Sequence, residues 1–255
     1  MNKKKYSILI LVFAIVSAVN AQTITVQPST IAQLICKNGV STTLSVTATG
    51  SGLTYQWFNN SIASKAGATL IPGATGSTYT PPTTTIGIQY YFCQVVPSVS
   101  YGGRTWMKSN LDVVNYNNGD PIPLVTNPSE WATLTTGAYC YVNNDGSPSS
   151  IATNGLLYNW FAVNDPRGIA PIGWHVATGA DFNAAGGFTG NRCGFRRANG
   201  NYDAENSKYH YGYWWTSEKE WTNTAWMRML DNDGTTLITL IEDQKVGFAV
   251  RCVKN

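Results

Sequence analysis

Short runs of alternating polar and apolar residues dominate the first hundred positions of the chain. Residues 43–48 alternate with a period of two, which is typical of a half-buried strand. Residues 53–58 and 89–96 are two further strand-like runs, and the glycine-rich stretch 50–52 separates the first two runs. The pattern predicts a small β-structure that extends to about Val99.

The remainder of the chain is rich in turn residues and has little helical periodicity. Residues 156–163 predict one short helix, and Asp181 to Ala185 predict a further helical turn. Residues 235–241 and 246–253 read as strands. The pair Asp233-Gly234 is typical of a hairpin turn. We therefore expect a mixed domain with more loop than regular structure.

The N-terminal pattern differs from both of these regions. Lys3 to Lys5 form a positive patch, Ile8 to Val16 form an apolar run, and Val19 to Ala21 end in small residues. This order is typical of a secretory signal peptide, and it predicts cleavage after Ala21. The apolar run is too short for a good membrane-spanning helix, and no later stretch is long and apolar enough. We expect an exported chain with no transmembrane segment.

Composition fits export and excludes one class of partner. Charged residues make up 12% of the chain, and the formal net charge of +3 falls to about zero once three lysines leave with the signal peptide. No basic patch for nucleic acid remains. About 230 mature residues suffice for one large domain or for two small ones, each with its own core.

The first segment resembles an immunoglobulin-like domain of exported bacterial proteins. The matching pieces are Tyr55-Gln56-Trp57, Ile71-Pro72-Gly73-Ala74-Thr75, Ser77-Thr78-Tyr79 and Tyr91-Phe92-Cys93. The resemblance implies an all-β sandwich over residues 22–101, with Trp57 in its core rather than on a sugar-binding surface.

The second segment is similar to the Fibrobacter succinogenes major paralogous (FISUMP) domain. The blocks that carry the similarity begin at Arg104-Thr105-Trp106-Met107, Gly155-Leu156-Leu157-Tyr158-Asn159-Trp160, Gly173-Trp174-His175, Tyr213-Trp214-Trp215 and Gly247-Phe248-Ala249-Val250-Arg251-Cys252. The resemblance implies an α+β, loop-rich, C-type-lectin-like domain over residues 102–255, related to formylglycine-generating-enzyme-like folds. It implies no established activity. The piece Cys193-Gly194-Phe195-Arg196-Arg197 departs from the family pattern.

Five cysteines in an exported chain suggest a disulfide framework. Cys36 and Cys93 fall in the same predicted domain and are expected to pair. Cys140 with Cys252 is the preferred second bridge, and Cys193 with Cys252 is the alternative. The chain has no C-x-x-C pair and only two histidines, which argues against structural zinc.

Candidate catalytic groups are few. His175 and His210 would each need a nucleophile and an orienting acid, and neither sequence context supplies them. The carboxylate pairs Glu218 with Glu220 and Asp231 with Asp233 would suit glycoside hydrolysis only at the right separation. A solvated surface explains them better, so no catalytic residue is assigned.

Ligand binding is the sharper hypothesis. The Glu-Pro-Asn, Gln-Pro-Asp and Trp-Asn-Asp triplets of calcium-dependent sugar-binding lectins are absent. Asp231-Asn232-Asp233 offers oxygen ligands suited to calcium, and it reads equally well as a turn. Exposed aromatic side chains are suited to stacking on sugars without a metal. The candidate ligand-binding residues are Tyr202, Tyr209, His210, Tyr211, Trp221, Asn223, Asp231 and Asp233.

These observations predict a secreted or cell-surface protein that binds or adheres, with glycan or a surface protein as its ligand. An immunoglobulin-like spacer would present a lectin-like recognition domain. The alternatives are a hydrolase or modifying enzyme that acts on extracellular polymer, and a structural component of the envelope.

Overall fold

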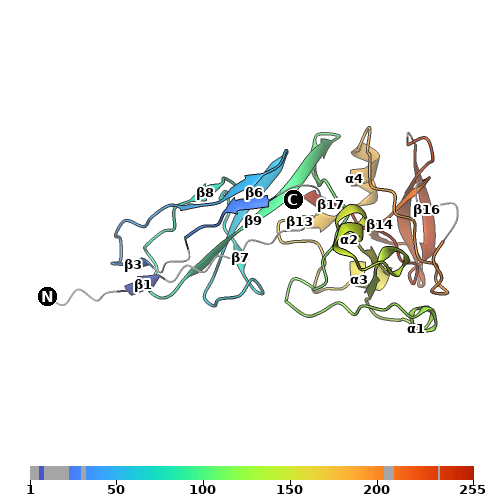
Figure 1. Cartoon of the computed structure of the whole chain (residues 1–255), viewed down its shortest axis with the longest axis horizontal. Helices are drawn as coiled ribbons and strands as arrows, with labels where there is room; N and C mark the ends of the chain where they lie inside the picture. Colours follow the sequence, from blue (N-terminus) through green and yellow to red (C-terminus); the bar gives the residue numbers. More distant parts are fainter. Residues whose placement is uncertain (1–5, 9–22, 30–32, 204–209, 235) are drawn as a thin grey trace. The chain divides into compact units, whose positions relative to one another are not determined.

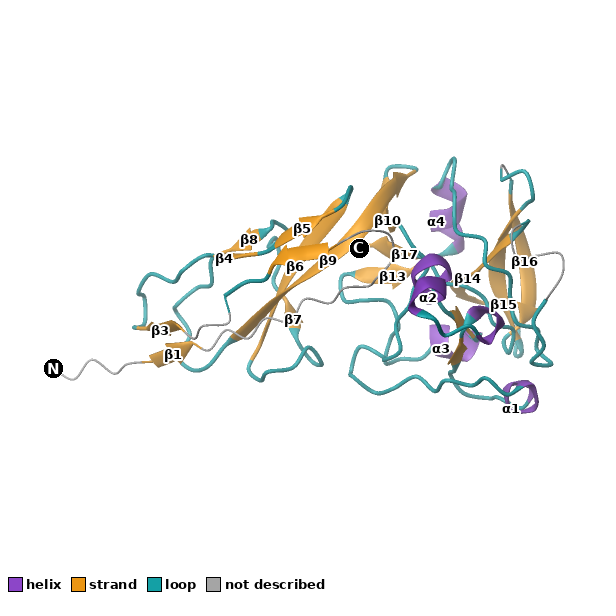
Figure 2. Ribbon diagram, in the orientation of Figure 1, coloured by secondary structure: helices purple, strands orange, loops and turns teal. Residues whose placement is uncertain are grey.

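The computed structural model describes residues 6–8, 23–29, 33–203, 210–234 and 236–255. The protein is mostly β, with a few short helices (Figures 1 and 2). Its largest sheet has the hydrogen-bonded strand order β13-β17-β10-β9-β6-β7. These strands are β6 (Leu53–Asn60), β7 (Thr69–Leu70), β9 (Tyr90–Tyr101), β10 (Arg104–Met107), β13 (Trp174–Val176) and β17 (Cys252–Lys254).

The chain divides into two compact units between Pro97 and Ser98. The division falls within β9. Residues 90–97 of this strand pair with β6 in the N-terminal unit, and residues 98–101 pair with β10 in the C-terminal unit. The predicted strand 89–96 is thus extended by five residues at its C-terminal end.

Three short strand pairs complete the N-terminal unit. They are β1 (Tyr6–Ile8) with β3 (Gln33–Ile35), β2 (Thr23–Val26) with β5 (Thr47–Thr49), and β4 (Leu44–Ser45) with β8 (Thr78–Tyr79). The predicted strand 43–48 is therefore two strands. It breaks at Val46, whose amide bonds to the carbonyl of Ser77 outside the named strands.

Trp57 lies at the centre of the N-terminal core, as expected, with no exposed surface. Its Nε1 donates to the carbonyl of Gly76 over 2.9 Å, and its ring stacks on Tyr79 with centroids 5.8 Å apart. Leu44, Val46, Tyr91, Cys93 and Val95 pack around it. The indole therefore buries a large apolar area without leaving its N–H unpaired.

The C-terminal unit holds the helices of the described chain, and each is short. They are α1 (Pro128–Ala132), α2 (Pro148–Asn154), α3 (Trp160–Val163) and α4 (Gly179–Ala184), with one 3₁₀ turn over Val142–Asn144. Side chains of Asn127, Ser147, Asn159 and Thr178 cap their first turns.

The predicted helix 156–163 is wrong in its first half. Residues 157–158 form strand β12 (Leu157–Tyr158), which pairs with β11 (Tyr139–Cys140), and only then does α3 begin. The cause is Asn159. Its extended backbone and its side chain, which accepts from the Ala162 amide, make it a helix start rather than a helix interior.

Tryptophan rings form the centre of the C-terminal core. Trp106, Trp131 and Trp214 are fully buried in one cluster with Phe182 and Phe188. A three-stranded antiparallel sheet supplies Trp214 and has the order β14 (Gly212–Lys219), β15 (Thr224–Leu230) and β16 (Leu237–Asp243). The expected strand 235–241 corresponds to β16. The expected strand 246–253 is reduced to isolated bridges and β17.

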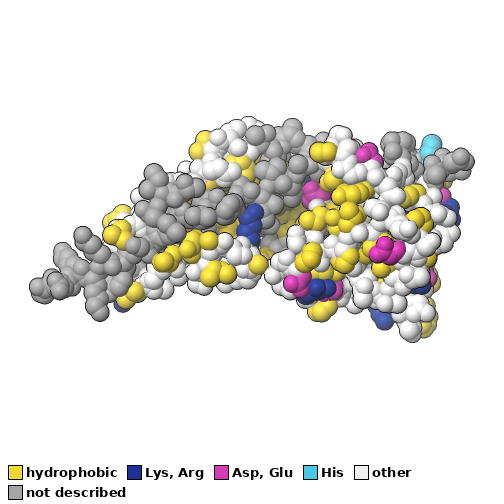
Figure 3. Space-filling model, turned by 60° about the horizontal axis from the view of Figure 1, so that its bottom comes forward, with side chains coloured by type: hydrophobic (Ala, Val, Ile, Leu, Met, Phe, Trp, Pro, Cys, Tyr) yellow, Lys and Arg dark blue, Asp and Glu magenta, His cyan; other side chains and the backbone are white. Residues whose placement is uncertain are grey.

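No helix in the described part of the chain is long and apolar enough to cross a membrane. On the face drawn in Figure 3, charged side chains are scattered among neutral polar and hydrophobic ones, and at one place basic and acidic side chains adjoin.

Candidate functional site

The predicted ligand-binding residues of the C-terminal sheet lie at its two opposite ends. Trp221 and Asn223 belong to the turn between β14 and β15, and Asp231 and Asp233 belong to the turn between β15 and β16. The seven residues of β15 separate the two turns by roughly 20 Å, given the rise of an extended strand. One small ligand therefore cannot contact both turns.

His210 and Tyr211 join the second of these groups. The Nδ1 atom of His210 lies 3.0 Å from the side-chain oxygen of Asn232, within the β15–β16 turn. Tyr211 directly precedes β14 and its ring centroid lies 6.3 Å from that of Tyr213. Tyr209, also predicted to bind ligand, lies outside the described residues.

Tyr202 is used in packing rather than presented to solvent. Its hydroxyl lies 2.9 Å from the carbonyl of Tyr141 and 2.8 Å from the side-chain oxygen of Asn144. Burial raises its pKa, and the guanidinium of Arg196 sits 5.1 Å from its ring centroid. These contacts leave the Tyr202 hydroxyl with protein partners instead of a ligand.

The turn that offers oxygen ligands for calcium is organised as a hairpin turn. The carboxylate of Asp231 accepts from the amide of Thr236 over 3.0 Å, and the backbone carbonyl of Asp231 accepts from the amide of Gly234. Within the described residues, no group of three or more His, Cys, Asp or Glu side chains is placed to hold a metal ion.

A polar cluster surrounds the carboxylate of Asp181, whose side chain is only 1% exposed. Its Oδ2 accepts from the amide and hydroxyl of Thr178, at 2.8 Å and 2.6 Å, and lies 3.0 Å from Nε2 of His175. Its Oδ1 accepts from the guanidinium of Arg104. The other ring nitrogen of His175 lies 2.7 Å from the side-chain oxygen of Asn255.

This cluster contains a histidine and an orienting acid but no free nucleophile. Both ring nitrogens of His175 are occupied, and the hydroxyl of Thr178 donates to the same carboxylate as the histidine. Thr178 and Asp181 together form the capping box of α4. The arrangement fixes the start of a helix, and it does not assemble a catalytic dyad.

The pKa of Asp181 lies below its usual value of 3.8. Burial acts to raise it, but the hydrogen bonds from Thr178 and the hydrogen bond and charge of His175 outweigh burial. The folded chain therefore prefers the ionised carboxylate. This preference stabilises the fold above the unfolded pKa and is lost as pH falls through the lower folded pKa.

The substitution Asp181→Asn should therefore destabilise the fold near neutral pH but not in acid. We expect it to lower the free energy of unfolding by about 2 kcal/mol near neutral pH, because charge-assisted hydrogen bonds to a buried carboxylate are replaced by neutral ones. The difference from the native chain should shrink as pH falls below 3.8. Urea unfolding across this range measures it, with Glu130→Gln as the surface control. A difference that stays constant with pH would contradict this account.

Glu218 is also committed to the fold. Its carboxylate accepts from the amide of Gly179 over 2.7 Å, at the first residue of α4. Burial lowers the pKa of the neighbouring Arg228, and the charge of Glu218 opposes that shift. Arg228 in turn donates to the carbonyl of Gly179 and to Asn183. This network ties β14 and β15 to α4, and it leaves Glu218 poorly placed to act as an acid or nucleophile.

Neither expected disulfide is formed in the structure, where all five cysteines are free thiols. Cys36 is exposed in the turn after β3, whereas Cys93 is buried inside β9 opposite Trp57. Cys140 and Cys252 occupy strands of different sheets, β11 and β17. Because same-domain membership says nothing of the side-chain separation that a bridge requires, the sequence could not test either pairing.

Burial makes the enclosed thiols unreactive. It raises the pKa of Cys93, Cys193 and Cys252 to about 12 each, so these groups stay protonated at neutral pH. Burial also raises the pKa of Cys140. The four buried cysteines therefore act as small apolar side chains.

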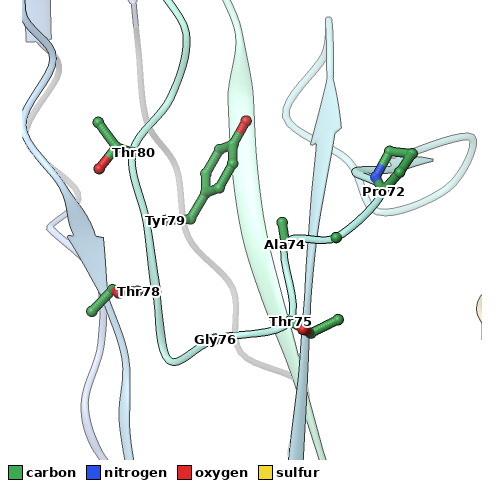
Figure 4. A pocket seen from close by; sticks show the side chains of 8 residues that line it. Pro72, Ala74, Thr75, Gly76, Thr78, Tyr79 and Thr80 are labelled. Carbon is green, nitrogen blue, oxygen red and sulfur yellow. The ribbon is translucent and has the colours of Figure 1, made fainter.

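A pocket of about 340 Å³ opens on the N-terminal unit between residues 72–76 and residues 78–80. Figure 4 shows the Tyr79 ring on one wall, with Pro72 and Ala74 on the other. Its lining contains threonine hydroxyls and backbone but no acid, base or cysteine. It has the groups for weak contact with a polar ligand, and its titratable side chain is Tyr79, whose pKa is raised by burial.

Sequence reasoning missed the two buried asparagines that organise the C-terminal core. Asn110 is 3% exposed and accepts from Nε1 of Trp214 over 2.8 Å. Asn159 is fully buried, accepts from the amides of Ala138 and Ala162, and donates to the carbonyl of Thr136. The available signal was that each asparagine stands inside a tryptophan-containing block of the sequence.

The C-terminal unit is thus a loop-rich domain with a tryptophan core, and its buried polar side chains are used mainly in its own hydrogen bonds. Residues 99–186 match the family model of the Fibrobacter succinogenes major domain, which confirms the first part of the resemblance seen in the sequence, while the blocks from Tyr213 and Gly247 onward lie outside the match. The match runs from the end of β9 through α4. No curated protein and no solved structure matches the chain.

Proposed function

We propose that this chain is an exported, non-catalytic binding or adhesion protein that recognises glycan through an aromatic side chain at the tip of the β14–β15 hairpin. An immunoglobulin-like sandwich serves as the spacer, and a lectin-like domain presents the recognition surface. The basic, apolar and small-residue order of the first 21 positions supports export.

The exposure of Trp221 carries this proposal. Its side chain is 65% exposed, whereas five other tryptophans of the chain are fully buried. Within the described residues its indole nitrogen has no hydrogen-bond partner, and the exposed Asn223 stands two residues away in the same turn. A flat aromatic face beside an amide is suited to stacking on a sugar ring while bonding its hydroxyls.

The state of the titratable groups supports binding over catalysis. The His175–Asp181 pair, Glu218 and the buried thiols are all held in structural roles. The pocket beside Tyr79 lacks a titratable side chain other than that tyrosine. A protein that only binds its ligand does not need reactive side chains. The structural roles of these groups are therefore consistent with adhesion.

The core of the N-terminal unit supports the sandwich assignment. The central tryptophan on β6 packs against Cys93 and Tyr91 of the neighbouring β9, which is the arrangement the immunoglobulin resemblance implies without its disulfide.

A glycan array probed with the full chain, with and without calcium, tests the proposal. We expect bound glycans to be retained after chelation, because no group of three or more His, Cys, Asp or Glu side chains in the described residues is placed to hold a metal ion. Trp221→Ala should weaken binding to the retained glycans about tenfold, equivalent to about 1.4 kcal/mol. Trp221→Phe should lose less, since it keeps an aromatic face.

The matched control is Ile62→Ala, an exposed apolar residue of the N-terminal unit. Neither Trp221→Ala nor this control should change thermal stability by more than about 0.5 kcal/mol, because both side chains are largely in solvent. A blank array, or equal binding by the native chain and Trp221→Ala, would refute the proposed role.

A further inference from the structure

The geometry points to a second recognition surface: the outer edge of β16 docks an extended segment of a partner protein, which adds a fourth strand to the β14-β15-β16 sheet. This surface is independent of the proposed glycan site, because it uses backbone groups and β16 side chains rather than Trp221. It would recognise peptide, not sugar.

The edge is long and open. β16 pairs with β15 along its whole length, from Leu230 opposite Leu237 to Thr224 opposite Asp243. Among the described residues, no strand pairs with its other side, and Figure 1 shows it as the last strand of its sheet. A fully extended strand of this length presents a row of amide and carbonyl groups spaced to receive another strand.

Several of the usual protections of an edge strand are missing from β16 in the described part of the chain, although its last two residues are acidic. The sequence Leu-Ile-Thr-Leu-Ile-Glu-Asp contains no proline, glycine or lysine, and its pairing with β15 has no bulge. Its five central residues are exposed. Soluble proteins normally guard such strands with lysine, proline or a bulge, so an unguarded edge indicates a surface that is covered by a partner.

The side chains define what the partner must offer. Ile238 and Leu240 are 36% and 40% exposed, and they lie opposite Met229 and Met227, which share their face of the sheet. An incoming strand would continue this face with apolar residues at every second position. Glu242 stands on the same face and is exposed, so a lysine or arginine of the partner would lie opposite it.

Charge argues against a second copy of this chain as the occupant. Two copies of β16 related by a twofold axis would pair antiparallel. Residues 236–244 contain Glu242 and Asp243 but no basic residue, so self-pairing would leave both carboxylates without a cation from the other copy. A heterologous segment with a basic residue resolves this mismatch.

A blocked peptide of sequence Thr-Lys-Thr-Val-Thr-Val-Thr provides the probe, because antiparallel pairing sets its lysine opposite Glu242 and its valines opposite Leu240 and Ile238. We expect calorimetry with the full chain to detect binding. Leu240→Lys should weaken peptide binding at least tenfold, because it places a lysine on the edge strand. The matched control Ile62→Lys, in the N-terminal unit, should leave peptide binding unchanged.

A charge swap tests the orientation. Glu242→Lys should weaken binding of the lysine-containing peptide. The same variant should bind the peptide in which glutamate replaces that lysine. Peptide binding that survives Leu240→Lys, or no binding at all, would overturn the proposal. So would a dimer of the native chain in sedimentation that Leu240→Lys dissociates, since the occupant would then be a second copy.

Discussion

Replacing Arg196 by alanine is expected to lower the free energy of unfolding of the C-terminal unit by about 4 kcal/mol. The side chain is fully buried and donates to the carbonyls of Gly200, Val125 and Thr126, at 2.8 Å, 2.6 Å and 2.9 Å. Its guanidinium also lies 4.5 Å from the ring centroid of Trp131. Alanine would remove a side-chain donor from all three carbonyls, of which, among the described residues, only that of Thr126 keeps another, the side-chain amide of Asn144 at 3.4 Å. It would also leave a cavity beside the Trp131 ring.

Arg196→Lys should recover only part of this loss. A lysine ammonium lacks the planar fork that reaches separate carbonyls and stacks on an indole. The neighbouring Arg197→Ala is the matched control. Arg197 is half-exposed and pairs with Asp203 at the surface, so its removal should cost no more than about 1 kcal/mol. Calorimetric unfolding of the three variants measures how much stability each one loses. A similar loss of stability for Arg196→Ala and Arg197→Ala would contradict this account.

Local patterns in the sequence predicted the core better than the boundaries. Trp57 was assigned to the N-terminal core from its strand context, and it is fully buried there. The strand predicted at residues 53–58 is present as β6, but it continues through Asn59 and Asn60, although asparagine is typical of turns. The reason is tertiary: the backbone of these asparagines pairs with Tyr91 and Tyr90 of β9, and pairing outweighs their weak strand preference.

The candidate site was harder to predict, because exposure is a property of the folded chain. Tyr202 and Trp221 are both aromatic residues in polar stretches of the sequence. In the fold, the Tyr202 hydroxyl is hydrogen-bonded to the carbonyl of Tyr141, whereas the Trp221 side chain is exposed to solvent. The cysteine pairings failed for the same reason. Export favours disulfides in general, but only the fold decides which sulfur atoms approach.

Asn110→Ala is the second substitution expected to have a large effect, about 3 kcal/mol of lost stability. The side-chain oxygen of Asn110 accepts from Trp214, and its nitrogen donates to the carbonyls of Asn154 and Asn191 over 2.9 Å and 3.2 Å. Alanine would leave the indole N–H of Trp214 without its hydrogen-bond acceptor at a fully buried position. Asn110→Asp should be no milder, because a carboxylate oxygen would face the two carbonyls.

A double-mutant cycle separates the hydrogen bond from the packing. Trp214→Phe removes the donor, so Asn110→Ala should cost about 1 kcal/mol less in that background than in the native chain. Asn118→Ala serves as the control: this exposed side chain bonds to Asp120 at the surface, and its removal should cost no more than about 1 kcal/mol. If the two core substitutions were strictly additive, the Asn110–Trp214 bond would contribute nothing. The asparagine in the Trp106–Asn110 block would then be explained by its bonds to Asn154 and Asn191 alone.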